Sequence, residues 1–324
     1  MFALTNKPEM GARLYSGIIE LAYDPERGTD GMKVIQHLAG VLCETYLLFD
    51  EPDQAMADSF GRLETLLGCK PLRGPISSEA LPPAHIIDYE TERGRKAARS
   101  LFEEWLDCEY EFHSLMLVIV QNILVRWEEQ GIPREESFRL LVECTKLCLG
   151  FEIAAQELCD VVIEQKVARE GWSLGDCIAS LSAIAGRRLA LSLSNDTCII
   201  FRGSDIPDNL DHVAHVMTQE AVRLGVPAGS DWRFGLAAND TPLNPPIELV
   251  RGIEPCCTSF FAAMTIDERY VQAIACAKAA GRMVAVAAGG ELPELEPAIA
   301  KPLAMAAMTE TYKYVCMDVQ IRAY

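Results

Sequence analysis

Three cysteines in the N-terminal half have a spacing that could serve thiol chemistry. Cys144, Cys148 and Cys159 are separated by four and eleven residues, and both offsets return to the same side of an α-helix. Thiolates gathered on one helix face could bind zinc or copper(I). The chain has no CxxC motif, and no histidine lies near this trio in sequence. Packing of small, buried thiols in a helical core is therefore the competing interpretation.

A pair of histidines forms a second candidate. His212 and His215 follow Asp211 in a segment that we expect to be helical over 208–224. Side chains at i and i+3 share a helix face and could ligate one metal ion. No third ligand is evident nearby, so a solvated helix face is the favoured interpretation of the pair. We predict no bound cofactor.

Motifs that accompany common enzymatic chemistry are missing from the chain. It contains no Walker A loop, no G-x-G-x-x-G after a strand, no G-x-S-x-G and no H-E-x-x-H. Nucleotide-dependent and hydrolase chemistry therefore have no visible support. An active site assembled from dispersed residues would leave no such motif, so enzymatic activity stays open, although we favour its absence.

The first half of the chain has the apolar periodicity of helices. Helices are predicted at about 8–22, 31–49, 53–68, 90–130, 134–149 and 151–170. Prolines and weak periodicity predict a long loop over 70–84. These elements predict an all-helical N-terminal domain over residues 1–170.

The pattern changes near residue 170, where Ser173 and Asp176 have the spacing of a capping box. Strands are predicted at 189–193, 198–201, 232–238, 283–288 and 312–319. Helices are predicted at about 173–186, 208–224, 266–280 and 294–309, and a proline-rich loop at 242–255. This alternation predicts a smaller α/β domain over 171–324, with one mostly antiparallel or mixed sheet covered by helices.

Three landmarks in this second half resemble a degenerate GGDEF domain, the palm-like fold of diguanylate cyclases, over about 173–288. A turn at 194–198 (SNDTC) lies where the family has its signature hairpin. The segment 234–237 (FGLA) resembles the family's S-I-G-x-A strand, and 277–282 (AKAAGR) resembles its closing A-K-x-x-G-R. The resemblance implies a ligand site at Asn195, Asp196, Lys278 and Arg282.

Departures from the family pattern lie at the catalytic positions. Ser194 and Asn195 stand where the family has glycines, and Asp196 is the one acidic residue left in the hairpin, since Thr197 occupies the other position. A single carboxylate is a poor site for magnesium, which needs an octahedron of oxygen ligands. The resemblance thus implies a catalytically inactive relative. An unrelated α/β domain that matches by chance is the alternative.

The net charge of −18 limits the classes of partner. No basic stripe offsets it, so binding to nucleic acid or to an anionic membrane surface is disfavoured. The first residues, MFALTNKPEM, lack the pattern of a secretory signal. The most apolar segment, Leu115–Val125, is too short to span a bilayer. These features predict a cytoplasmic protein without membrane insertion.

The sequence favours a non-catalytic regulatory or adaptor protein that acts through protein–protein contacts. We expect a protein partner, and a homodimer is one form that this could take. One alternative is an enzyme or small-molecule sensor with its ligand site between the two domains, because domain junctions often form pockets. A second alternative is a thiol-based metal or redox protein built on Cys144, Cys148 and Cys159.

Overall fold

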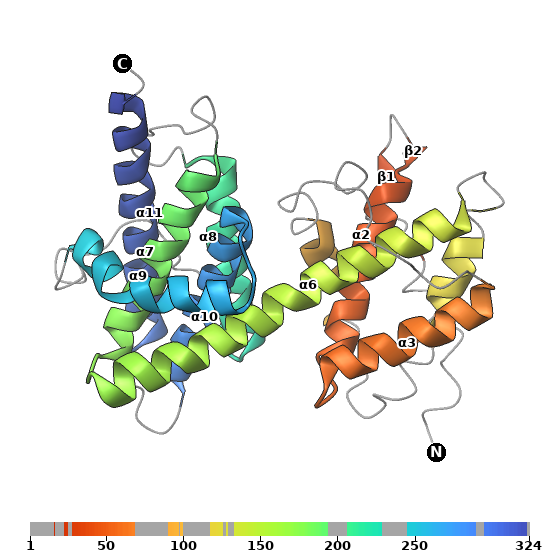
Figure 1. Cartoon of the computed structure of the whole chain (residues 1–324), viewed down its shortest axis with the longest axis horizontal. Helices are drawn as coiled ribbons and strands as arrows, with labels where there is room; N and C mark the ends of the chain where they lie inside the picture. The colour runs from red at the N-terminus through yellow and green to blue at the C-terminus, as the bar shows by residue number, and fades with distance from the viewer. Residues whose placement is uncertain are drawn as a thin grey trace. The chain divides into compact units, whose positions relative to one another are not determined.

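The structure, a computed structural model, divides the chain into two compact units, Met1–Gly150 and Phe151–Tyr324 (Figure 1). It describes residues 16, 23–24, 28–68, 90–96, 98–99, 117–125, 128, 133–193, 206–228, 245–289 and 295–322. The division falls at residue 150, inside a continuous helix, whereas the change of sequence pattern placed the boundary at residue 170.

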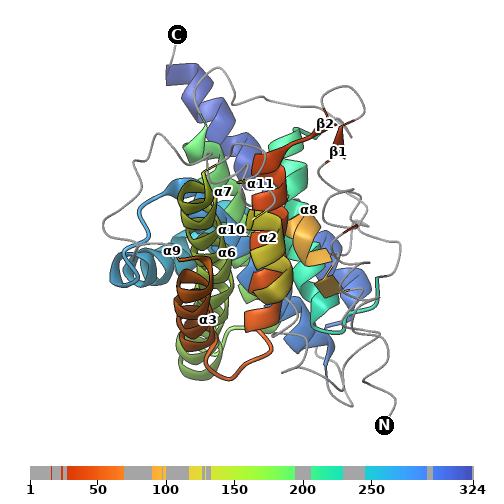
Figure 2. The ribbon, with the colours of Figure 1, turned by 90° about the vertical axis from the view of Figure 1, so that its right-hand side faces the viewer.

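The N-terminal unit is built around α2 (Gly31–Tyr46) and α3 (Pro52–Leu67), which pack together (Figure 2). Asp30 caps α2, because its carboxylate accepts hydrogen bonds from the backbone N–H groups of residues 32 and 33. The ring of Phe60 lies edge-on to Tyr46 at 6.2 Å and to Phe138 at 5.9 Å. These contacts and the buried face of α2 form the core of the unit. Both helices confirm the predicted segments 31–49 and 53–68.

Two short strands precede α2, namely β1 (Tyr23–Asp24) and β2 (Gly28–Thr29). They pair in antiparallel register, with Tyr23 opposite Thr29. Among the described residues, these four are the complete strand content.

Helix α6 (Arg134–Val162) is continuous where the sequence predicted two helices. It passes into a π-helix, η1 (Ile163–Arg169). Gly150, at which the sequence predicted a break, lies inside α6, and a Cβ there would meet no atom within 4 Å. A single glycine weakens a helix by only about 1 kcal/mol, so it does not end one of this length.

The described part of the C-terminal unit contains the end of α6, η1 and five further helices, with α7 at their centre (Figure 1). They are α7 (Leu174–Ser192), α8 (Asp208–Arg223), α9 (Pro246–Ala263), α10 (Arg269–Ala288) and α11 (Pro297–Arg322). Helix α7 packs against α9, α10 and α11, and α10 packs against α8. The hydroxyl of Ser173 accepts a hydrogen bond from the backbone N–H of Asp176 at 3.0 Å, which confirms the predicted start of α7.

Glycines allow two of these helix pairs to approach closely. A Cβ on Gly186 would lie 2.1 Å from the carbonyl oxygen of Met308, where α7 crosses α11. A Cβ on Gly281 would lie 2.3 Å from the carbonyl oxygen of Met217, where α10 crosses α8. Any side chain at either position would force the two backbones apart.

The predicted α/β domain is wrong, because the described part of the C-terminal unit is helical. Segment 189–193 includes the last turn of α7, 283–288 belongs to α10, and 312–319 belongs to α11. The predicted loop at 242–255 also contains the start of α9, where Pro246 occupies the first turn. The predicted strands 198–201 and 232–238 lie outside the described residues.

The strand predictions failed for a physical reason. A short apolar run has the same appearance in a buried strand and in a buried helix. Helix α10 is rich in alanine, the residue with the strongest helix propensity, and most of its side chains are buried on all sides. Among the described helices, α10 alone has the length and hydropathy to cross a membrane, and 78% of its most apolar window is buried inside the protein.

Candidate ligand pocket

A cavity of about 390 Å³ lies within the C-terminal unit, between α7, α9 and the start of α10. This volume falls in the range of small-molecule sites. The cavity is lined by both polar and apolar side chains: Arg187, Arg188, Leu191, Glu254, Thr258, Phe261, Ala262, Ile266, Asp267, Arg269 and Gln272. They come from segments up to 85 residues apart in sequence, which the helix packing brings together.

Helical spacing explains why these side chains face one cavity. On α9, Glu254, Thr258 and Phe261 follow one another at intervals of four and three residues, so they share one face. On α7, Arg187 and Leu191 are one turn apart, with Arg188 beside them. The packing of α7 against α9 and α10 turns these faces toward one another.

The guanidinium of Arg188 is the most deeply buried charge in the pocket, since its side chain is 6% exposed. Its Nη2 donates to Thr258 Oγ1 at 3.2 Å and lies 3.4 Å from Glu254 Oε1. Arg187 donates to the other carboxylate oxygen of Glu254. The Nε of Arg188 is buried and has no hydrogen-bond acceptor. A buried N–H without a partner is costly, so this group is ready to bind an acceptor atom.

The amide of Gln272 supplies the complementary group. Its Nε2 donates to the carbonyl oxygen of Ile266 at 2.6 Å. Because that carbonyl can only accept, the contact fixes which end of the amide is oxygen. The remaining atom, Oε1 of Gln272, is buried and has no donor. Two residues of the pocket lining therefore carry a buried polar atom without a protein partner, a donor on Arg188 and an acceptor on Gln272.

The connection between α9 and α10 forms one wall of the pocket. Helix α9 ends with the backbone N–H of Ile266 donating to the carbonyl of Phe261 at 2.9 Å. Thr265 adopts φ = 54°, a left-handed conformation that a β-branched residue rarely takes. The contact between Gln272 and Ile266 holds this connection against α10.

The pocket has a positive balance of charge although the chain is acidic. The described residues of its lining include three arginines and the two carboxylates of Glu254 and Asp267, a formal net charge of +1. Leu191, Phe261 and Ala262 add apolar surface. This combination suits a small molecule with an anionic group and an apolar body.

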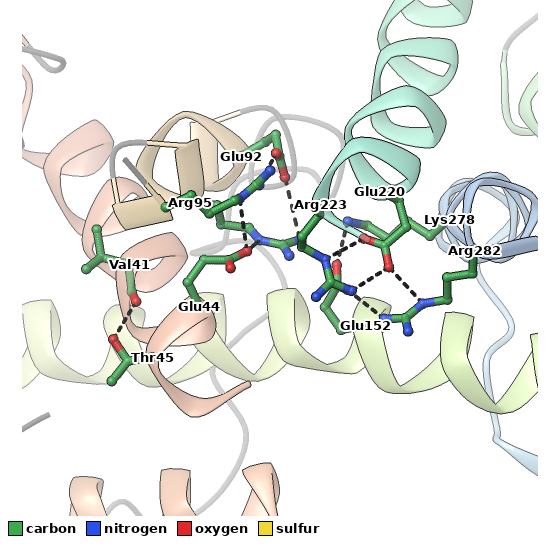
Figure 3. Close-up of polar contacts among 11 residues, drawn as sticks. Val41, Glu44, Thr45, Glu92, Arg95, Glu152, Glu220, Arg223, Lys278 and Arg282 are labelled. Carbon is green, nitrogen blue, oxygen red and sulfur yellow. Dashed lines mark hydrogen bonds and ion pairs between the residues drawn. The ribbon is translucent and has the colours of Figure 1, made fainter. Parts of the chain in front are cut away.

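The predicted ligand residues Lys278 and Arg282 lie elsewhere, in a buried charge cluster that joins α6, α8 and α10 (Figure 3). Glu152, whose side chain is 0% exposed, accepts from Lys278 Nζ at 2.6 Å and from Arg282 Nη2 at 3.2 Å. Glu220 pairs with Arg223 at 2.6 Å and with Arg282 at 2.8 Å. Lys278 and Arg282 are thus occupied by carboxylates of the protein itself.

This cluster also accounts for the A-K-x-x-G-R segment in terms of helix packing. Lys278 and Arg282 are one turn apart on α10 and face Glu152, while Gly281 allows α8 to approach. The segment lies inside a helix rather than before a strand. Asn195 and Asp196, and the other two landmarks of the GGDEF resemblance, lie outside the described residues, so that part of the resemblance stays a prediction.

The predicted cysteine site is spread along α6. Cys144, Cys148 and Cys159 are free and buried. The rise of a helix places Cys159 about 16 Å from Cys148 along the axis, too far for both to bind one ion. Burial raises the pKa of the Cys144 and Cys159 thiols to about 12, which disfavours the thiolate that binds metals.

Among the described residues, no group of three or more His, Cys, Asp or Glu side chains is placed to hold a metal ion. His212 is half-buried and His215 exposed on α8. In α11, Cys316 is disulfide-bonded.

Sequence reasoning missed a second set of buried charges, in the N-terminal unit. The Nε of Arg95 donates to Glu44 Oε1 at 2.5 Å, and Arg95 also pairs with Glu92 (Figure 3). His37 Nε2 lies 2.8 Å from Glu90 Oε2, with both side chains buried. The signal in the sequence was the pair of opposite charges at i and i+3, Glu92 and Arg95, in an otherwise apolar pattern. A pair on an exposed helix face has the same spacing, so the sequence alone does not show that this pair is buried.

Sequence reasoning also missed the pocket, because its members are dispersed and belong to no motif. Comparison with protein-family models gives no match for this chain. Comparisons with curated proteins and with solved structures give no significant match either. The function must therefore be argued from the site.

Proposed function

We propose that this protein is a non-catalytic regulatory protein whose C-terminal unit binds a small anionic molecule in the pocket between α7, α9 and α10. The observation that carries the proposal is Arg188, a residue of the pocket lining whose buried Nε has no acceptor. A carboxylate or similar anion would supply that acceptor and would be held by a charge-assisted hydrogen bond.

The lining of the pocket supports binding rather than catalysis. None of the described residues that line it is His, Cys, Ser or Lys, side chains that often act as nucleophile or general base. Glu254 is engaged by both Arg187 and Arg188, so it is poorly placed to take a proton from a ligand.

Binding in this pocket has a route to a change of conformation. Gln272 lines the pocket, and its amide Nε2 donates to the connection between α9 and α10 at Ile266. That connection holds Thr265 in an unfavourable backbone conformation, which costs about 1–3 kcal/mol. Occupancy of the pocket would therefore shift the conformation of the connection, and we propose that a protein partner binds one of the two conformations preferentially.

Thermal unfolding of the full chain with a panel of small ligands tests the proposal. The panel pairs small carboxylic acids with their neutral amides, each added separately. A ligand at a hundred times its dissociation constant stabilises the fold by about 2.7 kcal/mol. We expect at least one acid to raise the melting temperature and its amide to raise it less, because only the acid forms a charged pair with Arg188.

Two variants make this test specific to the pocket. Arg188→Met removes the buried guanidinium and keeps most of its apolar volume. Arg251→Gln removes an exposed arginine of α9 that does not line the cavity. The acid should stabilise the Arg251→Gln variant as it does the wild type, and should leave the melting temperature of Arg188→Met unchanged. Equal stabilisation of all three proteins would place the ligand elsewhere and contradict the proposal.

A further inference from the structure

We infer that the ligand of this pocket is an α-amino acid with an apolar side chain, an inference that rests on the proposed binding function. The starting point is that two residues of the pocket lining each carry a buried polar atom without a protein partner. Arg188 Nε needs an acceptor atom, and Gln272 Oε1 needs a donor. A simple carboxylate satisfies the first group and leaves the second unpaired.

An α-amino acid carries both missing groups on one carbon. Its carboxylate accepts from Arg188, and its ammonium group, which has three N–H donors, donates to Gln272. Arg269 and Asp267 lie exposed at the same cavity, so each charge of the zwitterion meets a second residue of opposite sign. Leu191 and Phe261 give the side chain of the ligand an apolar surface.

The balance of charge disfavours more highly charged ligands. A nucleotide or another polyphosphate brings several negative charges, whereas the pocket has a formal net charge of +1 and contains two carboxylates. Glu254 and Asp267 would repel such a ligand. A zwitterion adds no net charge and leaves the ion pairs of Glu254 with Arg187 and Arg188 in place.

Isothermal titration of the full chain with matched compounds tests this inference. The ligands are L-valine, L-leucine and L-phenylalanine, each measured beside the acid that lacks its amino group and the amine that lacks its carboxylate. We expect at least one of the amino acids to bind. Its acid and its amine should each bind at least about tenfold more weakly, the loss expected for one charge-assisted hydrogen bond.

Gln272→Met removes the acceptor while keeping the length of the side chain. We expect it to weaken amino-acid binding by about tenfold and to leave binding of the deaminated acid unchanged. Arg251→Gln is the matched control and should bind as the wild type does. If Gln272→Met fails to fold, the comparison of amino acid with deaminated acid on the wild-type protein decides alone.

The outcomes separate this inference from the proposed function. A deaminated acid that binds as tightly as its amino acid overturns the amino-acid inference and leaves the anion pocket standing. The amino-acid inference is also overturned if none of the three amino acids binds while other carboxylic acids stabilise the wild type but not Arg188→Met. The anion pocket stands in that case as well. If no carboxylate binds in either experiment, both the inference and the proposed function are wrong.

Discussion

Arg188 and Gln272 each carry a buried polar atom without a hydrogen-bond partner, and both residues line the pocket. Elsewhere in the C-terminal unit, buried charges such as Glu152 and Lys278 pair with each other at short distance. An unpaired buried polar atom costs about 1–3 kcal/mol. Two such atoms of opposite hydrogen-bonding character, on residues that line one cavity, are best explained by a ligand that pairs with both.

Glu90 gives a residue-level prediction in the N-terminal unit. Burial alone would raise the pKa of its carboxyl group, but the hydrogen bond to His37 and the charges of His37, Arg93 and Lys33 together lower this pKa below its usual value. The folded state therefore prefers the carboxylate. The resulting stability is present above the pKa of the unfolded chain, near 4.5, and is lost as the pH falls through the lower folded pKa.

We expect Glu90→Gln to reduce the free energy of unfolding by about 1–3 kcal/mol at pH 7. The difference from the wild type should shrink as the pH falls below 4.5, because the wild-type carboxylate then becomes protonated. Urea unfolding at several pH values measures both quantities. Glu135→Gln, at an exposed position on α6, is the control. A Glu90→Gln deficit that stays constant from pH 7 to pH 3.5 would contradict this account.

Residues that the sequence indicated as ligand or metal sites make different contacts in the structure from the predicted ones. Lys278 and Arg282 were expected to bind a ligand, and they pair with Glu152 in the protein interior. Spacing along the chain places two cations on one helix face, but it does not reveal what that face packs against. Cys144 and Cys159 similarly share a face, while their separation along α6 and their burial govern their chemistry.

At the level of helices, the crossing of α7 and α11 depends on Gly186. A Cβ at this position would lie 2.1 Å from the carbonyl oxygen of Met308. We expect Gly186→Ala to lower the free energy of unfolding by about 1–3 kcal/mol, because the backbones must separate to admit the methyl group. Chemical denaturation monitored by circular dichroism measures the change.

Gly150→Ala is the matched comparison. Gly150 also lies inside a helix, but a methyl group there meets no atom within 4 Å. Alanine restricts the unfolded chain more than glycine does, so this variant should gain about 0.5–1 kcal/mol. Equal effects of the two substitutions would show that the close approach of α7 and α11 is not what constrains Gly186.

Helix-forming periodicity was sufficient to predict α2, α3 and α8 but not the fold of the C-terminal unit. The amphipathic pattern of α3 and α8 gives one apolar face, which has a clear helical period. Helix α10 is buried on nearly every side, so its apolar residues carry no period. Its valines near Val284 were therefore predicted to lie in a strand. The tertiary packing that buries α10 is the information that the local sequence lacks.

For the molecule as a whole, Glu152 connects parts of the chain that are far apart in sequence. It pairs with Lys278, 126 residues away, and with Arg282 and Arg223. Its side chain is fully buried. We expect Glu152→Gln to lower the free energy of unfolding of the C-terminal unit by about 3–5 kcal/mol, because three cations lose a shared carboxylate and are left partly unpaired.

Glu157→Gln is the control for this prediction, since Glu157 is exposed on the same helix. Its effect should stay within about 0.5 kcal/mol. Urea titration of both variants, with helix content as the signal, makes the comparison. A loss below about 1 kcal/mol for Glu152→Gln would mean that solvent reaches the cluster and that the network does not bind the unit together.

The pocket depends on the packing of the C-terminal unit as a whole, because no local segment contains it. Arg188, Glu254 and Gln272 come from three helices and share no motif. Their positions follow only from the packing of α7 against α9 and α10. The prediction of a loop over 242–255 left Glu254 outside any helix, so it could not place Glu254 opposite Arg188. The helical phase of α9 was the one signal that could have suggested a shared polar and apolar face.

The central claim, that Arg188 and its neighbours bind a small carboxylate, is tested most directly by calorimetric titration of the wild type and Arg188→Met with the acid that stabilises the protein most. The account predicts one site per chain in the wild type and an affinity at least about a hundredfold lower in Arg188→Met, since a buried charged pair is lost. Arg251→Gln should match the wild type. Unchanged affinity in a folded Arg188→Met variant would contradict the account.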